Sequence, residues 1–145
     1  MNKKSDAAVG VFETGFNCAQ AVFTAFSDEL GLDRDSALKV SCGFGGGLAH
    51  SDGVCGAVSG AIMAISLKYG KSNPEDNAAK EKTYMLINRY LEDFKTRHGS
   101  INCTALIGYN LKSAADADKA REAGVFTSVC PELVRDSVEL TESLI

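Results

Sequence analysis

The chain has 145 residues, 45% of them hydrophobic and 23% charged, and a net charge of −4 at pH 7, which predicts one domain over residues 1–145 with a single core. An acidic balance without a basic cluster argues against nucleic acid as a partner. No apolar run approaches the roughly 18 residues of a membrane span and no secretory signal pattern opens the chain, so we expect a soluble cytoplasmic protein.

The chain is expected to be all-α, because it contains only two prolines and few alternating β-branched residues. We expect a compact domain of about five to seven helices. In chain order, the helical pattern covers residues 4–14, 18–30, 33–40, 54–69, 74–98 and 131–145, with a short helical turn at 103–108 and a helix or ordered surface excursion over 112–123. A glycine-rich, irregular loop, residues 42–53, is expected before the helix that begins near Val54.

The five cysteines include no C-x-x-C pair, which excludes a zinc ribbon, a thioredoxin-type motif and a c-type haem site. Four of them lie in or just before the predicted first turn of a helix: Cys18, Cys55, Cys103 and Cys130. A helix N-terminus favours the thiolate, because it offers free N–H groups and a partial positive charge. If these helix starts meet, they form a pocket of anionic sulfur that suits an iron–sulfur cluster. Cys42 is expected to fill the core, since it sits at a helix end.

The segment CGAVSGAIMA, which begins at Cys55, predicts a helix face that is almost free of side chains. Small residues recur there at four-residue spacing, at Gly56, Gly60 and Ala64. Such a face allows another backbone or a bulky cofactor to approach closely. Close packing of a second helix is the simpler interpretation, and a cofactor seat at Gly56 is the alternative.

The glycine-rich loop is expected to fold over whatever Cys55 holds. Its amides, those of Gly46 and Gly47 included, would then turn inward toward a cofactor. His50 lies in the same loop and is the better of the two histidines to replace a thiolate as ligand or to donate to a cluster sulfide. His98 is expected to interact with the C-terminal dipole of its helix.

These residues together resemble a family of small redox-active proteins labelled C_GCAxxG_C_C. The matching stretches, in order, are FNCAQAVFTAF at 16–26, GFGGGLA at 43–49, CGAVSG at 55–60, GSINCTALIG at 99–108 and CPELV at 130–134. The resemblance covers nearly the whole chain. It implies an α-helical domain whose redox function is carried by Cys18, Cys55, Cys103 and Cys130, with Cys42 outside this set.

Three functions stay open from the sequence. The first is an iron–sulfur protein for electron transfer or redox sensing, with three or four of the named cysteines as ligands. The second is a cofactor-free thiol–disulfide oxidoreductase, in which Cys55 attacks and another cysteine resolves the mixed disulfide. The third is a structural zinc domain. A redox partner protein is expected in the first case. The sequence leaves open whether the chain acts as an enzyme or as a carrier, and whether it is a monomer or a homodimer.

Overall fold

The computed structural model describes residues 3–145, and it confirms the all-α prediction. The helices, in chain order, are α1 (Lys3–Glu13), α2 (Cys18–Ser27), α3 (Arg34–Ser41), the 3-10 turn η1 (Cys42–Phe44), α4 (Gly45–Leu48), α5 (Gly56–Tyr69), α6 (Asn77–His98), α7 (Cys103–Ile107), α8 (Ala114–Glu122) and α9 (Val125–Leu144). The only extended pairing in these residues is one antiparallel bridge between Val54 and Asn102. None of the described helices has both the length and the apolar content to cross a membrane.

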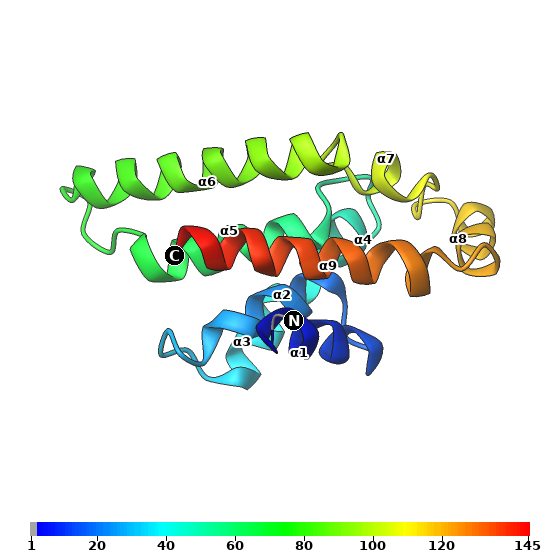
Figure 1. Ribbon diagram of the computed structural model, residues 1–145, viewed down its shortest axis with the longest axis horizontal. Coiled ribbons are helices and arrows are strands. Elements are labelled where there is room, and N and C mark those ends of the chain that lie inside the picture. Colours follow the sequence, from blue (N-terminus) through cyan, green and yellow to red (C-terminus); the bar gives the residue numbers. More distant parts are fainter. Residues whose placement is uncertain (1–2) are drawn as a thin grey trace.

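Helix α5 is the centre of the molecule. It packs against α2 on one side and against α6 and α9 on others, while α1 lies across α2 and α9 (Figure 1). Its glycine face receives α2, because a Cβ atom at Gly60 would lie only 2.7 Å from the carbonyl oxygen of Ala19. The helix-packing interpretation of the small-residue pattern is therefore confirmed at this position.

Side-chain caps explain where several helices begin. Asn17 caps α2 in a reciprocal capping box with Gln20, Asp33 caps α3 and Asn102 caps α7. The long helix α6 begins at Asn77 with Asp76 as its cap, three residues later than Pro74 suggested. It ends at Gly99, whose φ of 86° is the left-handed conformation expected of a C-terminal glycine.

The start of the last helix was predicted wrongly. Helix α9 begins at Val125 after a left-handed Gly124, so Pro131 lies inside the helix and Cys130 lies in its second turn. A proline inside a helix removes one backbone hydrogen bond. Burial of the apolar face that follows it, including Leu133, Val134 and Val138, outweighs this loss.

The glycine-rich stretch is more ordered than the predicted irregular loop. After η1, the five residues from Gly46 to His50 all have positive φ, between 55° and 77°. The amide of Ala49 donates to the carbonyl of Gly45 at 3.0 Å, so α4 is itself a left-handed helical turn, which extends to His50. Three of the five residues are not glycines, and each costs about 1–2 kcal/mol in this conformation. Packing of this left-handed turn against its surroundings must offset that cost.

A buried polar connection holds three helices together beside the cysteines. The Tyr90 hydroxyl of α6 lies 2.7 Å from the Ser137 hydroxyl of α9. Ser137 in turn donates to the carbonyl of Ala57 at 2.7 Å, in the first turn of α5. Both side chains are fully buried, so the network fixes the register of α6 and α9 against the start of α5.

Candidate functional site

Four cysteines line one cavity of about 120 Å³ at the end of the bundle. They are Cys18, Cys55, Cys103 and Cys130. The remaining walls are mostly apolar, from Phe12, Ile107, Leu111, Phe126 and Leu133, with Asn17, Gly46 and His50 completing the lining. Among these described lining residues there is no lysine or arginine to balance a negative sulfur. The structure thus brings together the four sulfurs that the sequence separates, while the catalytic and ligand roles given to them stay predictions.

The sulfur of Cys18 is placed by the cap of α2 and by a missing side chain on α5. Asn17 accepts from the Gln20 amide at 3.0 Å, which fixes Cys18 as the first residue of the helix. A Cβ atom at Gly56 would lie 2.5 Å from Cys18 Sγ. Because Gly56, the residue after Cys55, has no side chain, Cys18 Sγ has the space to approach Cys55.

The short antiparallel bridge sets Cys55 beside Cys103. The Cys55 amide donates to the Ile101 carbonyl at 2.7 Å, and the Cys103 amide donates to the Gly53 carbonyl at 3.0 Å. Each cysteine then opens a helix, Cys55 as the cap of α5 and Cys103 as the first residue of α7. Three of the four predicted helix-start positions are thereby confirmed.

Cys130 reaches the cavity in a different way. It projects from the second turn of α9, so the helix N-terminus predicted for it is wrong. Burial, together with the charges of Cys18 and Cys103, raises the pKa of the Cys130 thiol to about 12. Burial likewise raises the pKa of Cys103 to about 11, with smaller effects from the charges of Cys18 and Asp52. Both groups are thiols at neutral pH.

The Cys18 and Cys55 thiols form a hydrogen-bonded pair with opposite properties. The bond from Cys55 lowers the pKa of Cys18 from 9.0 to about 6, against the opposing effect of burial and with help from the backbone amides of Gly46, Cys18 and Ala19. The same bond, with burial, raises the pKa of Cys55 well above its ordinary value. Cys18 is half-buried and Cys55 is buried. At neutral pH the more accessible sulfur is thus the thiolate and the buried one donates to it.

Two of the glycines predicted to bind a cofactor lie in the left-handed turn. Gly46 lines the cavity, whereas Gly47 does not. The Gly46 amide bonds the Cys18 sulfur. Gly47 packs against the backbone of Gly53, and a Cβ there would lie 2.8 Å from Cys103 Cβ. His50 lines the cavity with its ring over Gly46, since a Cβ at Gly46 would lie 2.1 Å from His50 Cδ2.

One prediction on a single residue is wrong, and another is incomplete. Cys42 is exposed at the C-terminal end of α3, and so it does not fill the core. His98 does more than face its helix dipole, because its Nε2 lies 2.9 Å from Asp136 of α9. The aromatic walls Phe12 and Phe126 were not identified from the sequence, where nothing distinguishes them from ordinary core residues.

The fit of a metal centre depends on which centre is considered. Thiolates are the right donors for iron or zinc. Within residues 3–145, however, no three His, Cys, Asp or Glu side chains are grouped closely enough to hold a single metal ion. The predicted zinc site therefore has no preformed ligand set among these residues.

Comparison with known proteins agrees with the resemblance found in the sequence. One relative, an "Uncharacterized protein" of Archaeoglobus fulgidus, is 28% identical over 138 residues, which cover 88% of this chain and 83% of that protein. No solved structure matches the chain significantly. The model of the family described as "Putative redox-active protein (C_GCAxxG_C_C)" matches residues 16–144, which include all four cavity cysteines. With nearly its whole length matched, the chain belongs to the C_GCAxxG_C_C family.

Proposed function

We propose that the protein is a dithiol–disulfide redox protein in which Cys18 and Cys55 are the reacting pair. The observation that carries this proposal is that the two thiols lie at the wall of one apolar cavity, where the glycine after Cys55 leaves room for Cys18 Sγ. The roles are the reverse of those expected from the sequence. Cys18 is the nucleophile, since it is both the thiolate and the more accessible sulfur, and Cys55 is the resolving thiol.

The reaction needs a disulfide as oxidant, written R–S–S–R. The Cys18 thiolate attacks one sulfur of the substrate, the substrate S–S bond breaks, and RS⁻ leaves. Cys55 then transfers its proton to this leaving group and attacks Cys18 Sγ, which releases a second RS⁻. The products are the Cys18–Cys55 disulfide, one RSH and one RS⁻, so two electrons pass from the protein to the substrate.

Once the mixed disulfide has formed on Cys18, the surroundings of Cys55 favour its attack on that disulfide. The main cause of the raised pKa of Cys55 is its hydrogen bond to the Cys18 thiolate. A mixed disulfide on Cys18 carries no charge, so this cause disappears. The amides of Ala57 and Val58, at the start of α5, already act to lower the pKa of Cys55. They would then stabilise its thiolate for attack.

The structure describes the reduced form of the protein, because all five cysteines are free thiols. A substrate or partner protein carrying a disulfide would have to present it to Cys18, because Cys55, Cys103 and Cys130 are buried.

A second function is favoured by a separate observation. A dithiol needs two sulfurs, yet four line the same cavity, and the described lining residues include no cationic side chain. Cys18, Cys55, Cys103 and Cys130 would together hold an iron–sulfur cluster, which supplies one-electron transfer when bound. The apolar walls would limit water around it.

One experiment distinguishes the dithiol function from the iron–sulfur function. Protein prepared without oxygen and then exposed to a small excess of oxidised glutathione should lose two thiols reversibly, with a Cys18–Cys55 disulfide seen by peptide mass spectrometry. Cys18→Ser should abolish this loss, whereas Cys55→Ser should stop at the mixed disulfide between Cys18 and glutathione and lose one thiol only. Cys42→Ser, the matched control on an exposed cysteine, should leave it unchanged.

The variants of the other two cavity cysteines decide between the functions. Under the dithiol proposal, Cys103→Ser and Cys130→Ser keep the reversible loss of two thiols. Brown protein that contains iron and sulfide, and that loses its visible absorbance in all four cavity variants, would instead establish the cluster. A thiol count that oxidised glutathione does not change, in colourless protein, would contradict both.

A further inference from the structure

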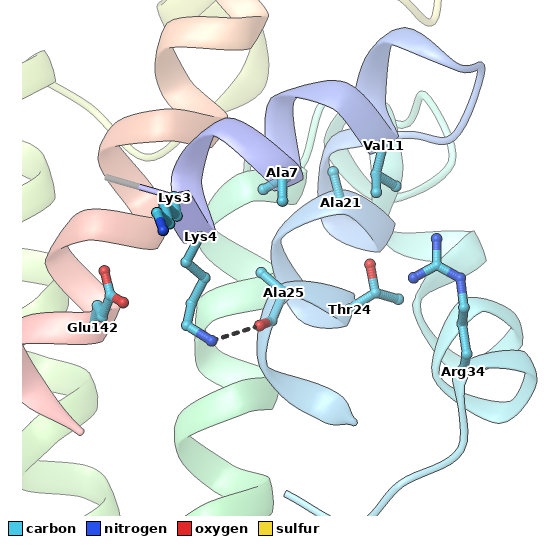
Figure 2. Close-up of a pocket in the computed structure, with 10 residues that line it drawn as sticks. Lys3, Lys4, Ala7, Val11, Ala21, Thr24, Ala25, Arg34 and Glu142 are labelled. Atoms are coloured by element: carbon cyan, nitrogen blue, oxygen red, sulfur yellow. Dashed lines mark hydrogen bonds between the residues drawn. The ribbon is translucent and has the colours of Figure 1, made fainter. Parts of the chain in front are cut away.

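A second and larger cleft, of about 510 Å³, lies apart from the cysteine cavity and shares no lining residue with it. Helices α1 and α2 form its walls, the first residue of α3 closes one end, and the C-terminal part of α9 borders it (Figure 2). Its volume is in the range of small-molecule sites.

Positive side chains gather around this cleft, although the whole chain has a net charge of −4. They are Lys3, Lys4 and Arg34, with Glu142 as the carboxylate in the lining. Lys4 is already engaged, because its Nζ donates to the Ala25 carbonyl at 3.1 Å and pairs with Glu29. No ion pair or hydrogen bond involves the side chain of Lys3 or Arg34 within the described residues.

The charged groups occupy the rim, and the floor is apolar. In Figure 2 the Arg34 guanidinium extends from α3 toward Thr24 and Val11, while the two lysines lie at the other end. Between them the floor exposes the small side chains of Ala7 and Ala25, whereas Ala8 and Ala21 also line it but are fully buried. The small volume of these side chains leaves the cleft open.

We propose that this cleft binds a small amphipathic carboxylate, with its charged group at Arg34 and its hydrocarbon body on the alanine floor. A guanidinium can hold a carboxylate through two parallel hydrogen bonds, which a lysine ammonium cannot do. The alanine methyls give a chain of several carbons an apolar surface to cover. The lysines at the far end add to the attraction for an anion.

The test uses octanoate as the probe and full-length protein labelled at its alanine methyl groups. Octanoate should shift the methyl resonances of Ala7 and Ala25 in a saturable way, and it should leave that of Ala114, in α8, unchanged. Octanol should bind at least several-fold more weakly, because it lacks the charge. Equal binding of octanol, or no saturable shift with octanoate, would overturn the proposal.

Two variants and one competitor sharpen this result. Arg34→Gln should weaken octanoate binding about tenfold, since a charged hydrogen-bond partner is lost, whereas Arg89→Gln on the exposed side of α6 should not. Ala7→Leu should also weaken it by filling the floor, at a position that is exposed and so tolerates the larger side chain. If inorganic phosphate displaces octanoate at equal concentration, the cleft recognises the negative charge alone and not the hydrocarbon chain. If neither Arg34→Gln nor Ala7→Leu changes octanoate binding, octanoate binds elsewhere on the protein. Either result overturns the proposal.

Discussion

Gly56→Ala tests the contact on which the redox pair depends. The added methyl would lie 2.5 Å from Cys18 Sγ, 3.0 Å from the Ala19 amide nitrogen and 3.1 Å from the Phe44 carbonyl oxygen. Two of these three neighbours are backbone atoms, so the sulfur is the atom with the most freedom to move. Overpacking of this kind costs about 1–3 kcal/mol, of which the better helix propensity of alanine returns less than about 1 kcal/mol.

The displaced sulfur should lose its hydrogen bond from Cys55. We therefore expect the pKa of Cys18 to rise from about 6 toward 9.0, the value without these interactions. The measurement is the rate of Cys18 alkylation by iodoacetamide between about pH 5 and pH 9, because only the thiolate reacts. Peptide mass spectrometry separates Cys18 from the exposed Cys42.

A glycine without neighbours provides the control. Gly10 lies in α1, and no described atom outside its own helical turn lies within 4 Å of its ideal Cβ position. Gly10→Ala should therefore keep the alkylation midpoint and leave the free energy of unfolding unchanged or slightly higher. A folded Gly56→Ala protein whose Cys18 still titrates near 6 would refute the reasoning, because the contact with Sγ would then not control the thiolate.

Three other measurements follow from the structure. The lowered pKa of Cys18 stabilises the folded state above pH 9.0, and this contribution is lost as the pH falls toward about 6. The raised pKa values of Cys103 and Cys130 have the opposite effect, because they reduce the stability of the folded state above about pH 9. Denaturant titrations should therefore show stability relative to Cys18→Ser rising from pH 6 to 9, and a flat difference would contradict the assignment. Ser137→Ala should cost about 1–3 kcal/mol, because it leaves the buried Tyr90 hydroxyl unpaired and removes the side-chain donor to the Ala57 carbonyl. Tyr90→Phe should cost about 0.5–1.5 kcal/mol, and the reverse order would refute the network. Ala49→Gly should raise the free energy of unfolding by about 0.5–1 kcal/mol, because Ala49 is exposed and has a φ of 55°, which glycine adopts without steric cost. A decrease in the free energy of unfolding would show instead that the Ala49 methyl group makes stabilising contacts.

The sequence was sufficient to predict the helices and three of the four sulfur positions, because these depend on local signals. Asn17 and Asn102 are caps that can be identified without any knowledge of the fold, and each is followed directly by a cysteine. Cys130 was misplaced by the preference of proline for the first helical position. In the fold, tertiary burial of the α9 face overrides this preference, and the helix begins at Val125 instead.

The convergence of the cysteines depends on contacts that no local pattern contains. The bridge that joins Cys55 to Cys103 pairs only one residue from each segment, Val54 with Asn102. Such a bridge is too short to produce alternation of polar and apolar residues. The left-handed turn from Gly46 to His50 also conflicts with the propensities of its non-glycine residues. It could not be predicted, although it supplies the amide that bonds Cys18.

The pKa values of the four cysteines also bear on the choice between the two functions. Without a cation in the cavity, each additional thiolate is opposed by the first, so one sulfur is charged and three keep their protons at neutral pH. Any metal centre held by all four sulfurs must therefore displace the protons of Cys55, Cys103 and Cys130. Loading the metal-free protein anaerobically in weak buffer should release about three protons per centre at pH 7, and the affinity should fall steeply with decreasing pH. Release of about one proton or none would mean that these three thiols do not bind the metal, and it would leave the Cys18–Cys55 dithiol as the redox centre.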